Sequence, residues 1–375
     1  MPSMTSRQAP HPIKRRLRAA LKWLHLWLGL SVGLVFAIVA LSGTVLAFQR
    51  EILAWSQPQL TAAPLPAPAQ REAALARIVA DWQALGLSSL DLPTAQLPVW
   101  QGYFPDGERR YFGGASGELL LVRNKGNDWV LWLRDLHTHL LAGKAGEQVL
   151  GVVGLIALFL LLSGLYLWWP RLSALGASLR WYRGPPTRRW FSWHRSAGAL
   201  LLPLTLLAVL TGVGMVYDGA ARSLLRTALG DGPDARKPPK LAARDATIDW
   251  AAVLRAADGR LPGAQLRRIG LPKGDSGLVT VRLRAAGEWH PVGRSMVWLD
   301  PYRAQVLGVH DATAQDAGAR ASEALYPLHG GFVGGRLWQW GVAFTGLVPA
   351  FLLVTGFLFW RRRTAPRRPL PATSG

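Results

Sequence analysis

The sequence of 375 residues contains no cysteine and few acidic residues. Without cysteine the chain can form no disulfide, no iron–sulfur cluster, no thiolate metal site and no covalent attachment of a c-type haem. Acidic residues number 22 against 43 lysines and arginines, which leaves a formal charge of +21 at pH 7. Such an excess is typical of nucleic-acid-binding proteins, but the positions of the charges along the chain argue against that class.

Charged residues are also missing from four long stretches, 26–48, 149–169, 197–217 and 337–360. A helix that crosses a bilayer needs about 20 apolar residues. We therefore expect an integral membrane α-helical protein with a four-helix transmembrane bundle. The first stretch is about twice as long as the apolar region of a cleaved signal peptide, which favours a retained helix.

The basic residues gather in the short segments 1–24, 170–193 and 361–375, which carry 16 of the 21 net charges and no acid. If four helices cross the membrane, these three segments lie on one side of it. The positive-inside rule assigns that side to the cytoplasm. We expect a multi-pass protein of a bacterial inner membrane with both termini cytoplasmic, surrounded by membrane lipid and without a nucleic-acid partner.

Two larger segments separate the helices on the other side, and we expect each to form a periplasmic α+β module. Helix patterns at 72–85 and 249–257 are each followed by alternating patterns that predict strands, at 97–104, 109–112 and 118–122 and at 264–270, 277–284, 295–299 and 306–309. The predicted order is tail 1–24, helix 25–50, module 51–135, helix 136–169 with an outer extension, loop 170–193, helix 194–217, module 218–327, helix 328–360 with an outer extension, and tail 361–375.

The two halves of the chain match at positions that carry histidine, serine or threonine, and glycine. The matches are His25 with His194 and Ser42-Gly43 with Thr211-Gly212 at an offset of 169 residues, and Leu136-His137 with Leu328-His329 and Ser163-Gly164 with Thr355-Gly356 at an offset of 192. We therefore expect two tandem repeats of the same topology, related by an axis along the membrane normal.

Four of the eight histidines occupy these matched positions at the ends of the predicted helices. His25 and His194 lie at the cytoplasmic ends of helices 1 and 3, and His137 and His329 precede helices 2 and 4 on the outer side. Two opposed neutral imidazoles within a helical bundle, in a chain without cysteine, indicate a b-type haem whose iron has two histidine ligands. The sequence thus predicts two haems, one for each pair.

Glycines are expected beside both pairs, Gly164 and Gly356 level with the cytoplasmic histidines and Gly43 and Gly212 nearer the outer ones. Small residues opposite each pair would leave room for a flat macrocycle. The alternative is that the histidines are polar anchors at the membrane interface and that the glycines mark close helix contacts without a cofactor.

Other charged and polar residues are left outside the predicted site. His139, two residues from His137, is an alternative outer ligand, His11 lies in the tail, and His290 and His310 are interpreted as surface histidines. Five arginines of the second module are interpreted as a solvated face that could steer an anion: Arg267, Arg268, Arg282, Arg284 and Arg294. His137 precedes the second apolar stretch by 12 residues, so either helix 2 begins well outside the bilayer or the chain bends near residues 143–146.

The motifs together resemble those of the PepSY-associated transmembrane family. The matching segments are 23–29 (WLHLWLG), 136–137 (LH), 163–171 (SGLYLWWPR), 193–198 (WHRSAG), 328–331 (LHGG), 355–356 (TG) and the turn 300–308 (DPYRAQVLG). The resemblance implies an inner-membrane, haem-containing ferric-siderophore reductase of the FoxB type, with two intertwined PepSY modules. It also implies that His25, His194, His137 and His329 are the haem ligands.

The leading functional hypothesis is electron transfer across the membrane to a periplasmic ferric siderophore, which releases Fe(II). No nucleotide-binding motif is present, so the electrons are expected from a separate cytoplasmic reductase or from quinol. One alternative is a non-catalytic membrane PepSY sensor or binding protein. Another is a siderophore or iron permease, which the absence of ionisable residues from the four stretches disfavours.

Overall fold

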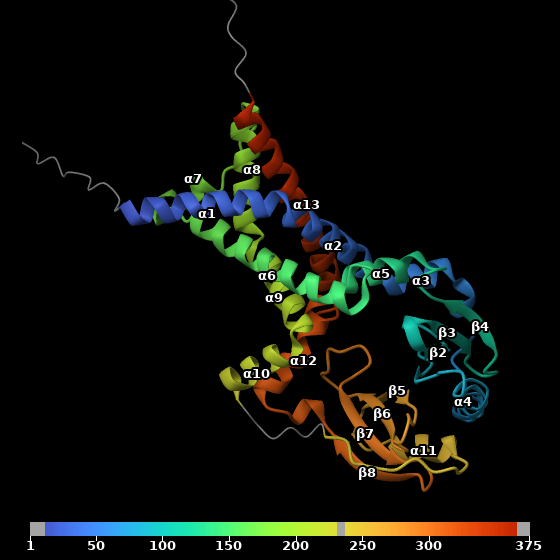
Figure 1. Cartoon of the computed structure of the whole chain (residues 1–375). Helices are drawn as coiled ribbons and strands as arrows, with labels where there is room; N and C mark the ends of the chain where they lie inside the picture. Colours follow the sequence, from blue (N-terminus) through green and yellow to red (C-terminus); the bar gives the residue numbers. More distant parts are fainter. Residues whose placement is uncertain (1–11, 231–236, 366–375) are drawn as a thin grey trace, which may run out of the picture.

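The structure is a computed structural model that describes residues 12–230 and 237–365 (Figure 1). Two helices are each long and apolar enough to cross a membrane, α6 (Gly143–Trp168) and α13 (Arg336–Thr364). Two bent pairs also qualify if each pair counts as one span, α1 (Pro12–Leu30) with α2 (Val32–Leu46) and α8 (Pro186–Leu200) with α9 (Leu202–Val216). The chain is therefore a helical membrane protein with two to four candidate spans, and the four-span bundle stays a prediction.

Each bent pair covers most of a segment for which the sequence predicts one helix, 25–50 or 194–217. The α1–α2 pair bends by 51° at Ser31, whose hydroxyl donates to the Trp27 carbonyl at 2.7 Å, a bond that often bends a helix. The α8–α9 pair bends by 63° just before Pro203, which has no N–H to donate to the preceding turn. Moreover, α1 begins at Pro12, within the segment expected to be a tail. Residues 1–11 and 366–375 of the two expected tails lie outside the described residues.

The membrane helices of the two halves pack against each other. Helix α13 contacts α2 and α8, and α6 contacts α9 and α1. Gly346 of α13 shows how close the helices come, since a Cβ at this position would lie 2.6 Å from the Ala40 carbonyl oxygen of α2. Small residues allow this approach of two backbones in a membrane.

Shorter helices join the membrane helices to the rest of the chain. They are α3 (Gln49–Ser56), α5 (Trp129–His139), α10 (Asp218–Leu229) and α12 (Ala317–His329), with α7 (Leu175–Ser178) in the loop before α8. Helix α5 is separated from α6 by a sharp turn, in which Leu140 and Leu141 have φ values of 47° and 61°. The outer extensions predicted for helices 2 and 4 are thus separate helices, because each is followed by a turn that contains left-handed residues.

The two expected modules share one antiparallel sheet of eight strands in the order β4-β3-β2-β1-β5-β6-β7-β8. The strands are β1 (Ser89–Asp91), β2 (Val99–Tyr103), β3 (Arg109–Gly113), β4 (Leu119–Arg123), β5 (Gln265–Gly270), β6 (Val279–Arg284), β7 (Ser295–Asp300) and β8 (Gln305–His310). Strand β1, which the sequence pattern did not reveal, joins the halves by pairing Leu90 with Ile269 of β5. The soluble part is therefore one joined α+β unit and not two independent modules.

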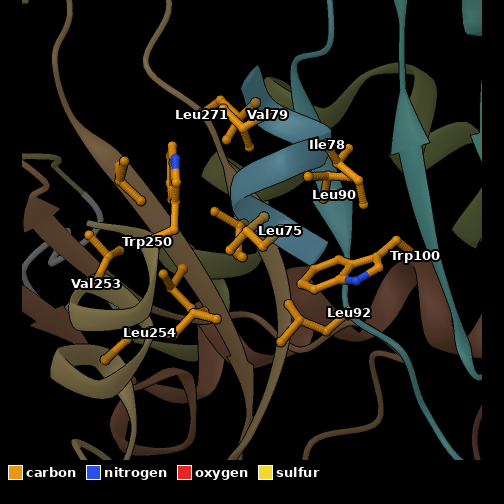
Figure 2. Packing of buried hydrophobic residues seen from close by; sticks show 14 of the residues in the cluster. Leu75, Ile78, Val79, Leu90, Leu92, Trp100, Trp250, Val253, Leu254 and Leu271 are labelled. Atoms are coloured by element: carbon orange, nitrogen blue, oxygen red, sulfur yellow. The ribbon is translucent and has the colours of Figure 1, made fainter. Parts of the chain in front are cut away.

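The main apolar core lies under one face of this sheet, and a smaller buried cluster around Tyr111 of β3 is separate from it. Helices α4 (Pro68–Trp82) and α11 (Trp250–Ala257) contact each other and cover residues from both halves (Figure 2). Leu75, Trp100 and Leu254 are each at most 1 % exposed. In Figure 1 these two helices lie beyond the sheet as seen from α5 and α12, so the uncovered face of the sheet is turned toward the ends of the membrane helices.

Candidate functional site

The structure brings the four matched histidines together in the two predicted pairs. His25 of α1 and His194 of α8 have ring centroids 6.3 Å apart, with an angle of 88° between the ring planes. His137 of α5 and His329 of α12 are 6.0 Å apart, with an angle of 50°. Each pair therefore joins one helix of the first half to one helix of the second.

Each of these histidines is held by its Nδ1 atom on a neighbouring helix. Nδ1 of His25 lies 2.9 Å from Ser163 Oγ, and Nδ1 of His137 lies 2.9 Å from both Ser42 Oγ and Val39 O. Nδ1 of His194 lies 2.9 Å from Leu352 O and 3.5 Å from Thr355 Oγ1. Nδ1 of His329 lies 3.0 Å from Ala208 O and 3.1 Å from Thr211 Oγ1. A carbonyl oxygen can only accept a hydrogen bond, so the Nδ1 atoms of three of the histidines must carry the proton.

His25 reaches the same tautomer by another route. The Ser163 hydroxyl donates to the Leu160 carbonyl at 3.2 Å, so its oxygen is left to accept from Nδ1 of His25. All four imidazoles thus carry a proton on Nδ1, which leaves Nε2 as the nitrogen that can bind a metal when the ring is neutral. Metal-binding histidines are commonly fixed in this way, because the second hydrogen bond sets both the tautomer and the ring orientation.

A glycine follows each of the four hydroxyl residues and lies against the same imidazole. A Cβ added to the glycine would approach Cε1 of the ring to 2.9 Å for Gly43 and His137, 3.1 Å for Gly212 and His329, 3.2 Å for Gly164 and His25, and 3.2 Å for Gly356 and His194. The glycines therefore make room for the imidazoles themselves. This differs from the expected role, in which they would make room for a macrocycle between the histidines.

The separation within each pair suits two axial ligands of one iron. Two imidazoles that bind one metal from opposite sides, each through a nitrogen at about 2.0 Å, have ring centres roughly 6 Å apart. The observed values of 6.3 and 6.0 Å agree with this distance. Among residues 12–230 and 237–365, no three or more histidine or acidic side chains gather to hold a bare metal ion, whereas haem iron needs only two axial protein ligands.

The remaining histidines do not join the pairs. His139 contacts Thr138 Oγ1 at 2.7 Å and Asp135 at 3.4 Å instead. His310, expected at the surface, is only 1 % exposed and packs beside Trp298, so that expectation was wrong. His11 lies outside the described residues.

Two residues near the outer histidine pair, Arg134 and His290, were not part of the site predicted from the sequence. Arg134 of α5 precedes His137 by about one helical turn, and the His290 ring packs against Tyr326 of α12 with 5.2 Å between ring centres. Burial, followed by Arg294 and further arginines, lowers the pKa of His290 to about 3. Positively charged side chains therefore lie close to the outer histidines, although the sequence pattern indicated that the strand arginines form an ordinary solvated face.

The fold and the site define a membrane protein whose apolar helices carry paired histidines and whose soluble part is a joined α+β unit. The family model described as PepSY-associated TM region matches residues 22–363, and the chain belongs to this family. No curated protein matches the chain.

Proposed function

We propose that this protein holds two b-type haems, one between His25 and His194 and one between His137 and His329, and carries electrons across a bacterial inner membrane to a ferric siderophore. The observation that carries the proposal is the repeated geometry of the two pairs. Four imidazoles, each hydrogen-bonded through Nδ1 to a neighbouring helix, lie two by two with ring centres 6.3 and 6.0 Å apart, a separation that suits two ligands of one iron. A helix-interface role alone would not require this tautomer in all four.

The direction of transfer follows from the charge distribution and the position of the sheet. The basic segments favour a cytoplasmic location for both termini and for the end that bears His25 and His194. The sheet then lies in the periplasm, beside His137 and His329. We therefore assign the inner pair to the electron donor, a quinol or a separate cytoplasmic reductase, and the outer pair to the ferric substrate.

The chemistry needs one electron for each iron. Bound haem supplies a one-electron redox centre at each pair, while the protein fixes the axial imidazoles and excludes water with apolar helices. A quinol that gives up two electrons and two protons would reduce two ferric chelates. Fe(II) is then released, because hard oxygen donors hold it far less tightly than Fe(III).

The first experiment is a visible spectrum of the purified full-length protein, oxidised and after dithionite. We expect a low-spin b-type spectrum and two haems per chain by pyridine haemochrome. Reduced protein in proteoliposomes should then be reoxidised by ferric siderophores added from outside, with ferrous iron trapped by ferrozine. A haem-free protein would overturn the proposal and favour a non-catalytic PepSY binding protein, and haem that reacts only with quinones would remove the siderophore from it.

A further inference from the structure

The face of the sheet that α4 and α11 leave uncovered carries a row of polar side chains. Gln101, Asp91, Arg268 and Arg282 lie directly opposite one another on β2, β1, β5 and β6, so they share one face. The residues between them along the strands point the other way, into the core. The row crosses the junction between the two halves, where the sheet is continuous.

Further arginines extend this row. The guanidinium group of Arg268 lies 4.2 Å from the centre of the Tyr103 ring, and that of Arg109 lies 5.7 Å from the same ring. Helices α3 and α5 and the hairpin between β6 and β7 add more cations, which lie close enough to the strand arginines to interact with them electrostatically. The arginine face therefore comprises Arg50, Arg109, Arg134, Arg267, Arg268, Arg282, Arg284 and Arg294.

The helices supply an aromatic wall beside the arginine face. The His290 ring packs against Tyr326 of α12 with 5.2 Å between ring centres, and Tyr326 packs against Phe332 at 5.4 Å, both in tilted arrangements. The Arg50 guanidinium lies 5.0 Å from the Phe332 ring centre. Because α12 ends at His329, this wall leads from the arginine face to the outer histidine pair.

The one carboxylate within the row, that of Asp91, does not balance the positive charge of the arginines. Asp91 accepts hydrogen bonds from Arg268 at 2.9 Å and from Tyr103 at 2.7 Å, and its charge is thereby engaged. Within the arginine face, and among the described residues, four guanidinium groups donate no hydrogen bond to the protein: Arg50, Arg109, Arg134 and Arg282.

Burial and neighbouring positive charges both act on arginines within the face. Burial, then Arg294 and Arg268, lower the pKa of Arg282, and burial followed by Arg109 lowers that of Arg134. A solvated face would let its cations spread apart into water. Here the fold holds them close together, at a free-energy cost that a bound anion would relieve.

We propose that the arginine face binds a polyanionic ferric chelate of the polycarboxylate class and holds it beside the outer histidine pair. This rests on the proposed reductase function, and it names the substrate class. Arginine pairs with a carboxylate through two parallel hydrogen bonds, and the four guanidinium groups without an acceptor offer several such pairings. A cationic trihydroxamate chelate would meet repulsion on the same face.

The test measures binding without electron transfer. Gallium(III) citrate is a redox-inert stand-in for ferric citrate, and its binding to full-length protein in phosphatidylcholine nanodiscs can be followed by calorimetry. We expect binding that weakens as salt rises and that the double variant Arg134→Gln/Arg282→Gln weakens by roughly 100-fold, about 10-fold for each charged hydrogen-bond donor. The cationic gallium(III) complex of desferrioxamine B should bind far more weakly.

Arg255→Gln is the matched control, because Arg255 lies on α11, across the core from this face, and pairs with Glu72 in an exposed ion pair. It should bind gallium citrate like the wild type. Haem content of the double variant should equal that of the wild type. Loss of haem would instead assign these arginines to the cofactor's own carboxylates and overturn the proposal.

Other outcomes separate this inference from the reductase proposal. Wild-type protein that reduces ferrioxamine B but does not bind gallium citrate would overturn only the inference. Haem-free protein that still binds gallium citrate through Arg134 and Arg282 would support the anion site while ending the reductase proposal. If phosphatidylglycerol in the nanodisc abolishes the binding, the face is a lipid headgroup site and the inference is wrong.

Discussion

The contact between Gly43 and His137 gives a direct test of how the outer imidazole is held. The methyl group added by Gly43→Ala would lie 2.9 Å from Cε1 of His137, whereas carbon atoms in ordinary contact are about 3.5–4.0 Å apart. The ring must therefore move by about 1 Å, which lengthens the 2.9 Å bonds from Nδ1 to Val39 and Ser42. A buried hydrogen bond lost in this way costs about 1–3 kcal/mol, or about 5–150-fold in haem affinity.

Haem titration of the apoprotein, with pyridine haemochrome as the count, measures this loss. Gly43→Ala should keep one haem with wild-type affinity and hold the other weakly. Alanine favours a helix more than glycine does, so unfolding of α2 would not explain the loss. Gly219→Ala on α10, where no atom lies within 4 Å of the added Cβ, should bind both haems normally. Undiminished affinity for both haems in folded Gly43→Ala would refute the idea that the glycine seats the imidazole.

Three further predictions concern single residues. His194→Ala should leave one haem per chain by pyridine haemochrome, because His137 and His329 form a separate pair; loss of both from a folded protein would contradict the pairing. Ser163→Ala removes the hydroxyl that holds His25 at 2.9 Å, so haem should transfer to apomyoglobin roughly 10-fold faster or more, and Ser163→Thr should restore retention. The pKa of His290 is about 3 in the folded protein, against 6.5 for a free side chain. Between these pH values the unfolded chain binds a proton at this residue and the folded chain does not. The stability of the folded state therefore falls as the pH drops from 6.5 toward 3. His290→Gln should lessen the fall in melting temperature between pH 6.5 and 4, and an unchanged slope would show that other groups cause it.

Much of the candidate site could be predicted from local sequence. The matched His, Ser-Gly and Thr-Gly motifs recur at constant offsets, and their position along an apolar helix sets their depth in the membrane. This was enough to pair His25 with His194 and His137 with His329, and to place each glycine beside the correct pair. The role of each glycine could not be predicted, because it depends on which atom of a distant helix lies above it.

The arginine face was missed for a related reason. Arg268 and Arg282 occupy alternating strand positions, and alternation alone does not say which face meets solvent and which meets another part of the protein. That depends on where α5 and α12 bring Arg134 and Tyr326. A single arginine on a strand does not by itself indicate a binding site. Only the tertiary structure shows that several arginines share one surface.

The sequence by itself determined the membrane character, the family and the location of most helices and strands, because apolar runs, alternation and motifs are local properties of the chain. The tertiary structure decided what depends on contacts between distant residues. Leu90 and Ile269, nearly 180 positions apart, join two expected modules into one sheet, and the three-residue strand β1 is too short to leave a pattern. The contact between His25 and His194, whose rings lie edge-on 6.3 Å apart, likewise depends on the packing of helices that are distant in sequence.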